Sequence, residues 1–195
     1  MALGMAPAPY EPRFDSGRSC LDLVATDHPV ERLDSVTALR AWLAGAGLVP
    51  PDTRPVAVNP QWLDHFRELR ARIAELVGGE IDRLPAPGAL ERVNALAAAA
   101  PPVPYAVRAA DGTLVRALRE EPGCAALVAA VARDAVDLLT DPAARVLLRR
   151  CEGDNCPLVY LDTSRGHRRR WCSSEVCGNR ERVARHRRRA ALART

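Results

Sequence analysis

Apolar residues between positions 59 and 78 recur every three or four residues, a spacing that predicts an amphipathic helix. Asn59 is a favourable N-cap, and the proline that follows it suits the first helical position. Gly78 and Gly79 come after the pattern and are expected to end the helix, because glycine readily leaves the helical conformation. The residues expected on the buried face are Trp62, Phe66, Leu69, Ile73 and Leu76.

The same periodicity predicts further helices on either side of this segment. Ser35 is expected to cap a helix that runs to about Ala46. Another helix is expected over residues 89–99, and a long one from Pro122 to about Leu139. Aromatic residues are few and alanine is abundant, which favours helices that pack through Ala and Leu.

Three other segments carry local signals. Asp141 and Pro142 match an N-cap followed by a first-position proline, for a short helix over residues 143–150 that leads into Cys151. Residues 19–25, SCLDLVA, form a short apolar run that fits either a buried strand or the start of a helix. Residues 50–60 are rich in proline and predict a linker.

The hydrophobic pattern loses its helical period after residue 102, and the segment that follows predicts one β-hairpin. Asp111-Gly112 lies between two runs with strand-like content, VPYAV and TLVRAL, and this dipeptide favours a tight hairpin turn. Together these patterns predict an α+β fold that is mainly α. Its parts are a helical N-terminal body with a hairpin, over residues 1–144, and a small C-terminal module over residues 145–195.

Charge separates the two parts. The chain has no lysine, and residues 145–195 carry 14 arginines against five acids, a net charge of +9. The first 144 residues carry 14 arginines against 19 acids, a net charge of −5. A proteome that uses arginine in place of lysine would explain the missing lysine but not this asymmetry. A basic end on an acidic body indicates that the two parts have separate roles, and the basic end is suited to binding a polyanion.

Four of the six cysteines form two close pairs. Four residues separate Cys151 from Cys156 and Cys172 from Cys177, and 15 residues lie between the pairs. Two such pairs joined by a loop can supply four thiolates to a tetrahedral zinc ion. Because the protein would fill all four positions, the spacing predicts one structural Zn²⁺ and no catalytic metal.

The residues around the cysteines predict a small treble-clef-like finger. PLVYLDTS, between the pairs, has strand-like content, with Tyr160 on the opposite side from its neighbours. The chain after Cys172 predicts a helix capped by Ser173 or Ser174, with Cys177 in its first turns. Trp171 is expected in the small core of the finger, with stacking on a base as the alternative.

Other interpretations of the cysteines stay open at this point. Two disulfides would need an oxidising compartment. The opening residues lack a basic segment followed by an apolar one, so we expect no secretory signal. We therefore expect a cytoplasmic protein. Four unrelated buried cysteines or an iron–sulfur cluster are the remaining alternatives. Cys20 and Cys124 are isolated and are expected to be small buried side chains.

The arginines of the module are candidate nucleic-acid contacts. On a helical wheel, Arg182, Arg185 and Arg189 fall within about 60° of one another, with valine and alanine on the far side. Arginines before the second cysteine pair are placed to hold phosphates from a loop. Neutralising the zinc–thiolate charge is the competing explanation of the whole set. The predicted contacts are Arg168, Arg169, Arg170, Arg182, Arg185, Arg188 and Arg189.

Arginines outside that stripe are expected to have internal roles. Arg180 and Arg187 lie near the apolar side of the wheel and are expected to pair with acids inside the module. Asp162 is the predicted partner of Arg180.

The finger resembles a known family at these residues. CGNR at Cys177–Arg180, LDTSR at Leu161–Arg165, RRWC at Arg169–Cys172 and the four-cysteine spacing are similar to the CGNR zinc finger. CLDLVATDH, near Cys20, resembles the opening of the ABATE domain, although Ala25 stands where that domain usually has asparagine. The two modules occur together in bacterial proteins described as stress-induced transcription regulators. The resemblance implies zinc at the four cysteines and DNA binding in transcriptional control.

The leading hypothesis is therefore a bacterial regulator whose finger holds DNA and whose body senses a small-molecule effector or forms a homodimer. An RNA-binding zinc module and a protein-interaction adaptor are the alternatives. No run of 18 apolar residues predicts a membrane span. The sequence has no P-loop, GxGxxG, HExxH or GxSxG motif, so an enzyme is not expected.

Overall fold

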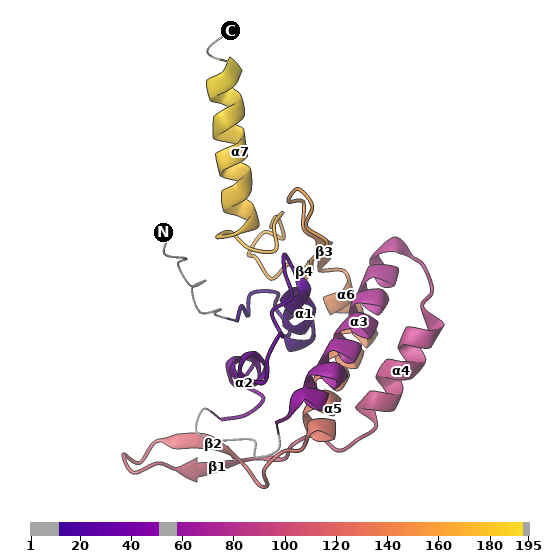
Figure 1. Ribbon diagram of the computed structural model, residues 1–195, viewed down its shortest axis with the longest axis vertical. Coiled ribbons are helices and arrows are strands. Elements are labelled where there is room, and N and C mark those ends of the chain that lie inside the picture. Colours follow the sequence, from indigo (N-terminus) through magenta and orange to yellow (C-terminus); the bar gives the residue numbers. More distant parts are fainter. Residues whose placement is uncertain (1–11, 51–57, 193–195) are drawn as a thin grey trace, which may run out of the picture.

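A computed structural model describes residues 12–50 and 58–192 (Figure 1). The described chain is mostly helical, with two antiparallel two-stranded sheets and a C-terminal cysteine cluster, which confirms the predicted fold class. Two long helices, α3 (Pro60–Asp82) and α5 (Cys124–Thr140), pack together, and α4 (Pro87–Ala97) packs on both. The predicted linker falls mainly on residues 51–57, outside the described residues.

The main core lies between these helices. Trp42, Phe66, Leu69, Ile73 and Leu138 are among its fully buried side chains, and burying each contributes about 1.5–3 kcal/mol. The face predicted for the helix after Asn59 is the buried one, apart from its last residue, which is partly buried. Within the two described ranges, no helix is long and apolar enough to cross a lipid bilayer.

Helix starts follow the capping signals in the sequence. The hydroxyl of Ser35 accepts from the N–H of Ala38 at 3.1 Å and caps α2 (Val36–Gly45). The side chain of Asn59 accepts from the N–H of Gln61 at 3.0 Å and caps α3. Helices α4 and α5 are also confirmed, although each begins two residues from its predicted start.

The prediction that the two glycines end α3 is wrong. The helix continues through Gly79 to Asp82 and ends at Arg83, whose φ of 58° is left-handed. Gly79 is needed for packing instead: a Cβ there would lie 2.5 Å from the carbonyl oxygen of Leu84. The chain therefore folds back tightly onto its own helix before α4, and glycine makes this close approach possible.

The ambiguous run at residues 19–25 is helical. It forms α1 (Ser19–Val24), followed by the single turn η1 (Ala25–Asp27). Asp134 of α5 fixes its start, because the carboxylate accepts from the Ser19 hydroxyl at 3.0 Å and the Cys20 N–H at 2.8 Å. A carboxylate at a helix N-terminus also interacts favourably with the helix dipole.

The hairpin is confirmed. Strand β1 (Pro104–Arg108) pairs antiparallel with β2 (Leu114–Leu118), and Val107 lies opposite Val115. Asp111 stabilises the turn, since its carboxylate accepts from the N–H of Thr113 at 2.9 Å. Gly112 supplies the left-handed φ of 84° that the turn requires.

The short helix predicted over residues 143–150 is confirmed only in its first turn. Helix α6 covers only Pro142–Arg145, and the chain then forms β3 (Leu148–Arg150), which pairs with β4 (Val159–Leu161). Pairing with β4 supplies partners for the backbone groups of β3 that a helix would otherwise satisfy internally. An extended chain here also buries Leu148 and delivers Cys151 at the end of the strand.

Strand β4 joins the body to the C-terminal module. Val159 and Leu161 contact the main core, whereas Tyr160 points to the other face and packs with the cysteines. The N–H of Leu161 donates to the carbonyl of Ser16 at 2.8 Å, which attaches the segment before α1. The division of the chain after residue 144 stays a prediction, but side chains beyond it complete the core of the body.

Candidate metal centre and basic helix

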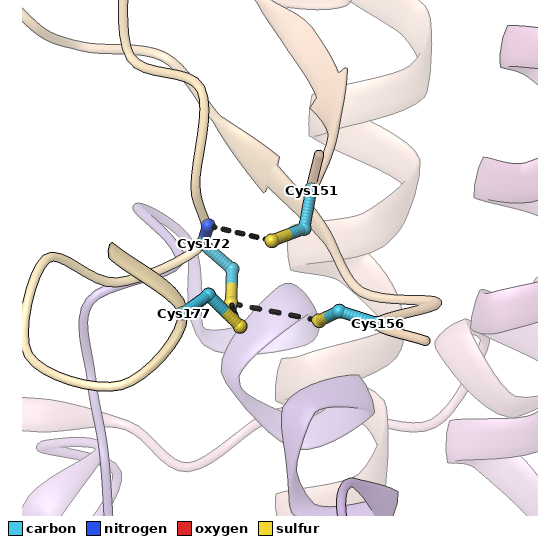
Figure 2. Close-up of side chains that lie close together, drawn as sticks. All are labelled: Cys151, Cys156, Cys172 and Cys177. Atoms are coloured by element: carbon cyan, nitrogen blue, oxygen red, sulfur yellow. Dashed lines mark hydrogen bonds between the residues drawn. The ribbon is translucent and has the colours of Figure 1, made fainter. Parts of the chain in front are cut away.

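The four predicted ligands come together in the C-terminal module, residues 145–195, called the finger from here on. Cys151 follows β3, Cys156 lies in the turn before β4, Cys172 follows the next loop, and Cys177 begins α7 (Cys177–Leu192). Their Sγ atoms lie within 4.8 Å of one another, and Figure 2 shows the side chains converging on one point. This order of turn, strand, loop and helix agrees with the predicted finger.

The spacing of the sulfurs fits a zinc ion. Four thiolates at about 2.3 Å from Zn²⁺ in a tetrahedron lie about 3.8 Å apart. The Sγ of Cys172 is 3.8 Å from that of Cys156 and 3.6 Å from that of Cys177. All six cysteines are free thiols, so the disulfide alternative is wrong. Because Cys151, Cys172 and Cys177 are buried, the centre has the closed character of a structural site.

Electrostatics also favours a cation at this centre. Burial raises the pKa of Cys156 to about 12, and the nearby Cys151 thiolate adds to the shift. Burial and the neighbouring thiolates raise the pKa of Cys172 still further. Burial opposes ionisation of Cys151 as well, but backbone N–H groups of Cys172 and Gly153 donate to its Sγ and hold its pKa below the ordinary value. A divalent cation offsets the repulsion between the thiolates.

Two residues with special backbone roles shape the first cysteine turn. A Cβ on Gly153 would lie 3.1 Å from the Cβ of Cys177 and 3.2 Å from its Sγ, so a larger residue would push the cysteines apart. Asn155 has a φ of 56°, a left-handed conformation that asparagine tolerates better than most residues. The turn can therefore bring Cys156 back toward Cys151.

Arg169 holds the finger together. Its guanidinium lies 4.5 Å from the ring centre of Tyr160 and donates to the carbonyls of Asp15 at 3.0 Å, Trp171 at 2.8 Å and Cys172. The Tyr160 hydroxyl in turn donates to the carbonyl of Arg169 at 2.5 Å. All three guanidinium nitrogens thus bind protein carbonyls, which gives Arg169 a structural role, and the phosphate contact expected at this residue stays a prediction.

The arginines on either side of Arg169 differ from it. Arg170 pairs with Glu152 at 2.6 Å, remains exposed, and stacks 5.1 Å from the ring centre of Trp171. Arg168 is exposed and lines a groove of about 380 Å³ with Trp171 and Ser174. Trp171 itself packs against the cysteines, which confirms its place in the finger core.

Helix α7 begins later than predicted. The hydroxyl of Ser173 accepts from the N–H groups of Glu175 at 3.1 Å and Val176 at 3.3 Å, so it caps a turn that precedes the helix. The helix starts at Cys177, which fixes its first residue at the metal centre. From there α7 projects away from the body (Figure 1).

The predicted contacts on α7 lie at the surface. Arg182, Arg185 and Arg189 are exposed, and the only side-chain hydrogen bond that the described residues show for these three joins Arg182 to the carbonyl of Ser174. Arg188 is also exposed and lies 3.8 Å from Glu181. The structure therefore presents this part of the predicted set together on one helix.

The expected pairing of Arg180 with Asp162 is wrong. Asp162 is buried, and its carboxylate accepts from the hydroxyl and N–H of Ser164 and from the N–H of Arg169. The bond from the Ser164 hydroxyl, together with the two backbone bonds, lowers the pKa of this carboxyl group. Asp162 therefore shapes the loop between β4 and Cys172. A serine two residues after an aspartate was the available signal, since this pattern favours a local turn.

The protein is of the class in which a helical body is joined to a four-cysteine zinc finger, and here the two parts share strand β4. Residues 17–142 match the ABATE family, described as "Putative stress-induced transcription regulator", and residues 147–190 match the CGNR zinc finger. The chain belongs to the ABATE family. Its four clustered cysteines bind one structural zinc ion, and neither family is an enzyme family. A comparison with curated proteins gave no match.

Proposed function

We propose that this protein is a bacterial DNA-binding transcription regulator that acts in the cytoplasm. In this proposal the finger holds DNA, and the body senses a ligand or forms a homodimer. One observation carries it: α7 has six arginines and one acid, and it projects from a metal-bound first residue. A helix of 16 residues is about 24 Å long, enough to lie in a groove or along a phosphate backbone.

The positions of the arginines support a contact surface on one side of the finger. Arg182, Arg185 and Arg189 form the stripe on α7, and Arg168 and Arg170 lie in the loop near the base of the helix. Phosphate contacts from such side chains give affinity that falls steeply with salt. Arg170 and Arg188 are weaker candidates because Glu152 and Glu181 lie close to them.

The two alternatives have less support from the residues. Readers of single-stranded RNA commonly stack bases on exposed aromatic side chains. Tyr160 is buried in the finger, and Trp171 is partly buried because it packs against the cysteines. A protein adaptor would use the arginine stripe to bind an acidic partner, and absence of DNA binding by the zinc-loaded chain would favour that function.

The test is fluorescence-anisotropy binding of random duplex DNA to the zinc-loaded full chain, between about 50 and 200 mM salt. Arg182→Gln, Arg185→Gln and Arg189→Gln are combined in one variant. We expect the slope of log affinity against log salt to become shallower by about 0.9 for each phosphate that the variant no longer neutralises. No binding at low salt would contradict the proposal, and tighter binding of single-stranded RNA would favour the RNA alternative.

A matched control carries the same three charge changes elsewhere. Arg40, Arg72 and Arg108 are exposed and lie on α2, α3 and β1, away from the finger. Their combined change to glutamine removes the same net charge and is expected to alter the salt slope much less. Equal losses in the two variants would mean that overall charge, and no particular surface, determines binding.

A further inference from the structure

An open groove of about 840 Å³ lies on the body, between the corner that joins α3 to α4 and the segment that joins α6 to β3. Leu84 and Val146 line it from opposite sides, and their side chains are 65% and 67% exposed. Small-molecule sites commonly have volumes of about 300–1,000 Å³, with apolar walls and a few polar groups. The groove therefore has the size and the walls for a small molecule.

The charges in the groove favour an anion. Arg145 pairs with Glu80 across it, so these two charges offset each other. Arg83 makes no ion pair with any carboxylate in the described part of the chain. Arg149 donates to the carbonyls of Val146 at 2.7 Å and Leu148 at 2.8 Å. These neutral acceptors do not offset its positive charge. Two uncompensated guanidinium groups thus flank apolar walls.

The groove also adjoins the metal centre along the chain. Arg149 lies in the middle of β3, two residues before the zinc ligand Cys151. The residue between them, Arg150, pairs with Asp82 at the end of α3. Contacts made in the groove therefore bear on the strand that positions the first cysteine.

We propose that this groove binds a small amphipathic anion: an apolar molecule with a carboxylate or similar acidic head. The head pairs with Arg83 and Arg149, and the apolar part covers Leu84 and Val146. Charge-assisted hydrogen bonds to arginine are about twice as strong as neutral ones, so the head gives specificity. This proposal deepens the sensing role proposed for the body, and its test does not involve DNA.

The test is an NMR titration of the ¹⁵N-labelled, zinc-loaded full chain with decanoate. Decanol, which keeps the chain without the charge, and acetate, which keeps the charge without the chain, are the matched probes. We expect saturable shifts at the amides of Gly79, Leu84 and Leu148 with decanoate, and binding about tenfold weaker with either other probe. Shifts elsewhere, for example at the exposed hairpin residues Tyr105 and Val115, would overturn the proposal.

Substitutions of residues that line the groove test the same proposal. Arg83→Gln is expected to weaken decanoate binding about tenfold, and Leu84→Asp to abolish it, because it replaces an apolar wall with a negative charge. Arg40→Gln on α2 is the control and should bind as the unaltered chain does. Unchanged affinity in Arg83→Gln would overturn the proposal. A chain that binds decanoate but no DNA would support this site and contradict only the proposed function.

Discussion

Helices α5 and α7 are almost equal in length but opposite in character. Helix α5, with 17 residues, buries Leu127, Val131, Ala135 and Leu138 in the body. Helix α7, with 16 residues, carries six arginines and projects into solvent from the metal centre. This fold therefore holds helices in two ways: α5 through a buried face, and α7 through one end.

Because α7 is held at one end only, its stability depends on the cysteine cluster and on what binds along its length. Arg185 lies three or four residues from Arg182, Arg188 and Arg189, and like charges at these spacings destabilise a helix by about 0.2–0.5 kcal/mol per pair. Isolated helices shorter than about 12–15 residues are marginal in water even when rich in alanine, and α7 is only slightly longer, at 16 residues. We infer that the cysteine cluster orders the start of α7 and that a bound polyanion would stabilise the rest of it.

The largest expected effect comes from removing the metal. Structural zinc contributes about 10–16 kcal/mol of apparent folding free energy in finger peptides. Cys156→Ser, or chelation, should therefore unfold the finger and also lower the melting temperature of the body, because β4 contributes to both cores. Thermal melting followed by circular dichroism, with metal content measured by mass spectrometry, checks this.

Cys124→Ser is the matched control for that variant. Cys124 is half-buried at the start of α5 and lies outside the cysteine cluster, so its replacement should leave the zinc content unchanged. A body that melts at the same temperature with and without metal would show that the two cores are independent and that β4 does not couple them.

The next largest effect is expected on the free energy of unfolding, when a side chain is truncated on α5 and on α7. Leu138→Ala on α5 should lower the free energy of unfolding by about 2–5 kcal/mol, because it leaves a cavity in a fully buried site. Val183→Ala on α7 should change it by less than about 0.5 kcal/mol, since that side chain is 42% exposed. Urea unfolding measures both. A large cost at Val183 would mean that α7 packs against something in solution.

A smaller effect concerns the pH dependence of the body. Burial raises the pKa of Asp22 from 3.8 to about 6, although the N–H of Ser16 donates to its carboxylate at 2.9 Å. The folded chain therefore holds this proton more tightly than the unfolded chain, and stability falls as the pH rises from about 4 past 6. Asp22→Asn should remove that fall, which amounts to about 3 kcal/mol.

Unfolding midpoints in urea at several pH values test the role of Asp22. Asp64→Asn, on the exposed face of α3, makes the same chemical change at the surface and should leave the pH profile as it is. The explanation fails if Asp22→Asn retains the full decline in stability between these pH values.

The smallest effect is expected from relieving repulsion on α7. Arg185→Ala removes three like-charge pairs and one favourable i,i+4 spacing, to Glu181, and it introduces the best helix former. The helicity of α7 in the free chain should therefore rise slightly. ¹³Cα chemical shifts of α7 measure this, and Arg40→Ala on α2 is the control. Reduced helicity in Arg185→Ala would show that this arginine stabilises the helix through a contact of its own.

Local patterns in the sequence predicted much of this fold. Ser35 and Asn59 cap their helices as expected, and Asp111-Gly112 turns the hairpin, because each depends on neighbouring backbone groups. The end of α3 was not predictable in this way. Gly79 is required by the approach of Leu84 from the returning chain, a contact that no local pattern reveals.

The metal ligands were predictable from spacing, whereas the roles of single arginines were not. Two cysteine pairs suffice to indicate a tetrahedral site. Arg169 and Arg170 are neighbours in one basic run, yet the first binds the carbonyls of Asp15, Trp171 and Cys172 and the second is exposed. The difference comes from the fold of the loop around Tyr160, which brings the carbonyls to Arg169.

Hydrogen exchange of the zinc-loaded chain, measured by mass spectrometry with and without duplex DNA, tests whether α7 is the DNA-binding element. We expect peptides from α7 to exchange quickly in the free chain and to be protected by DNA, while peptides from α5 are protected in both states. Rapid exchange of α7 that DNA leaves unchanged would contradict the claim that this metal-anchored helix is the DNA-binding element.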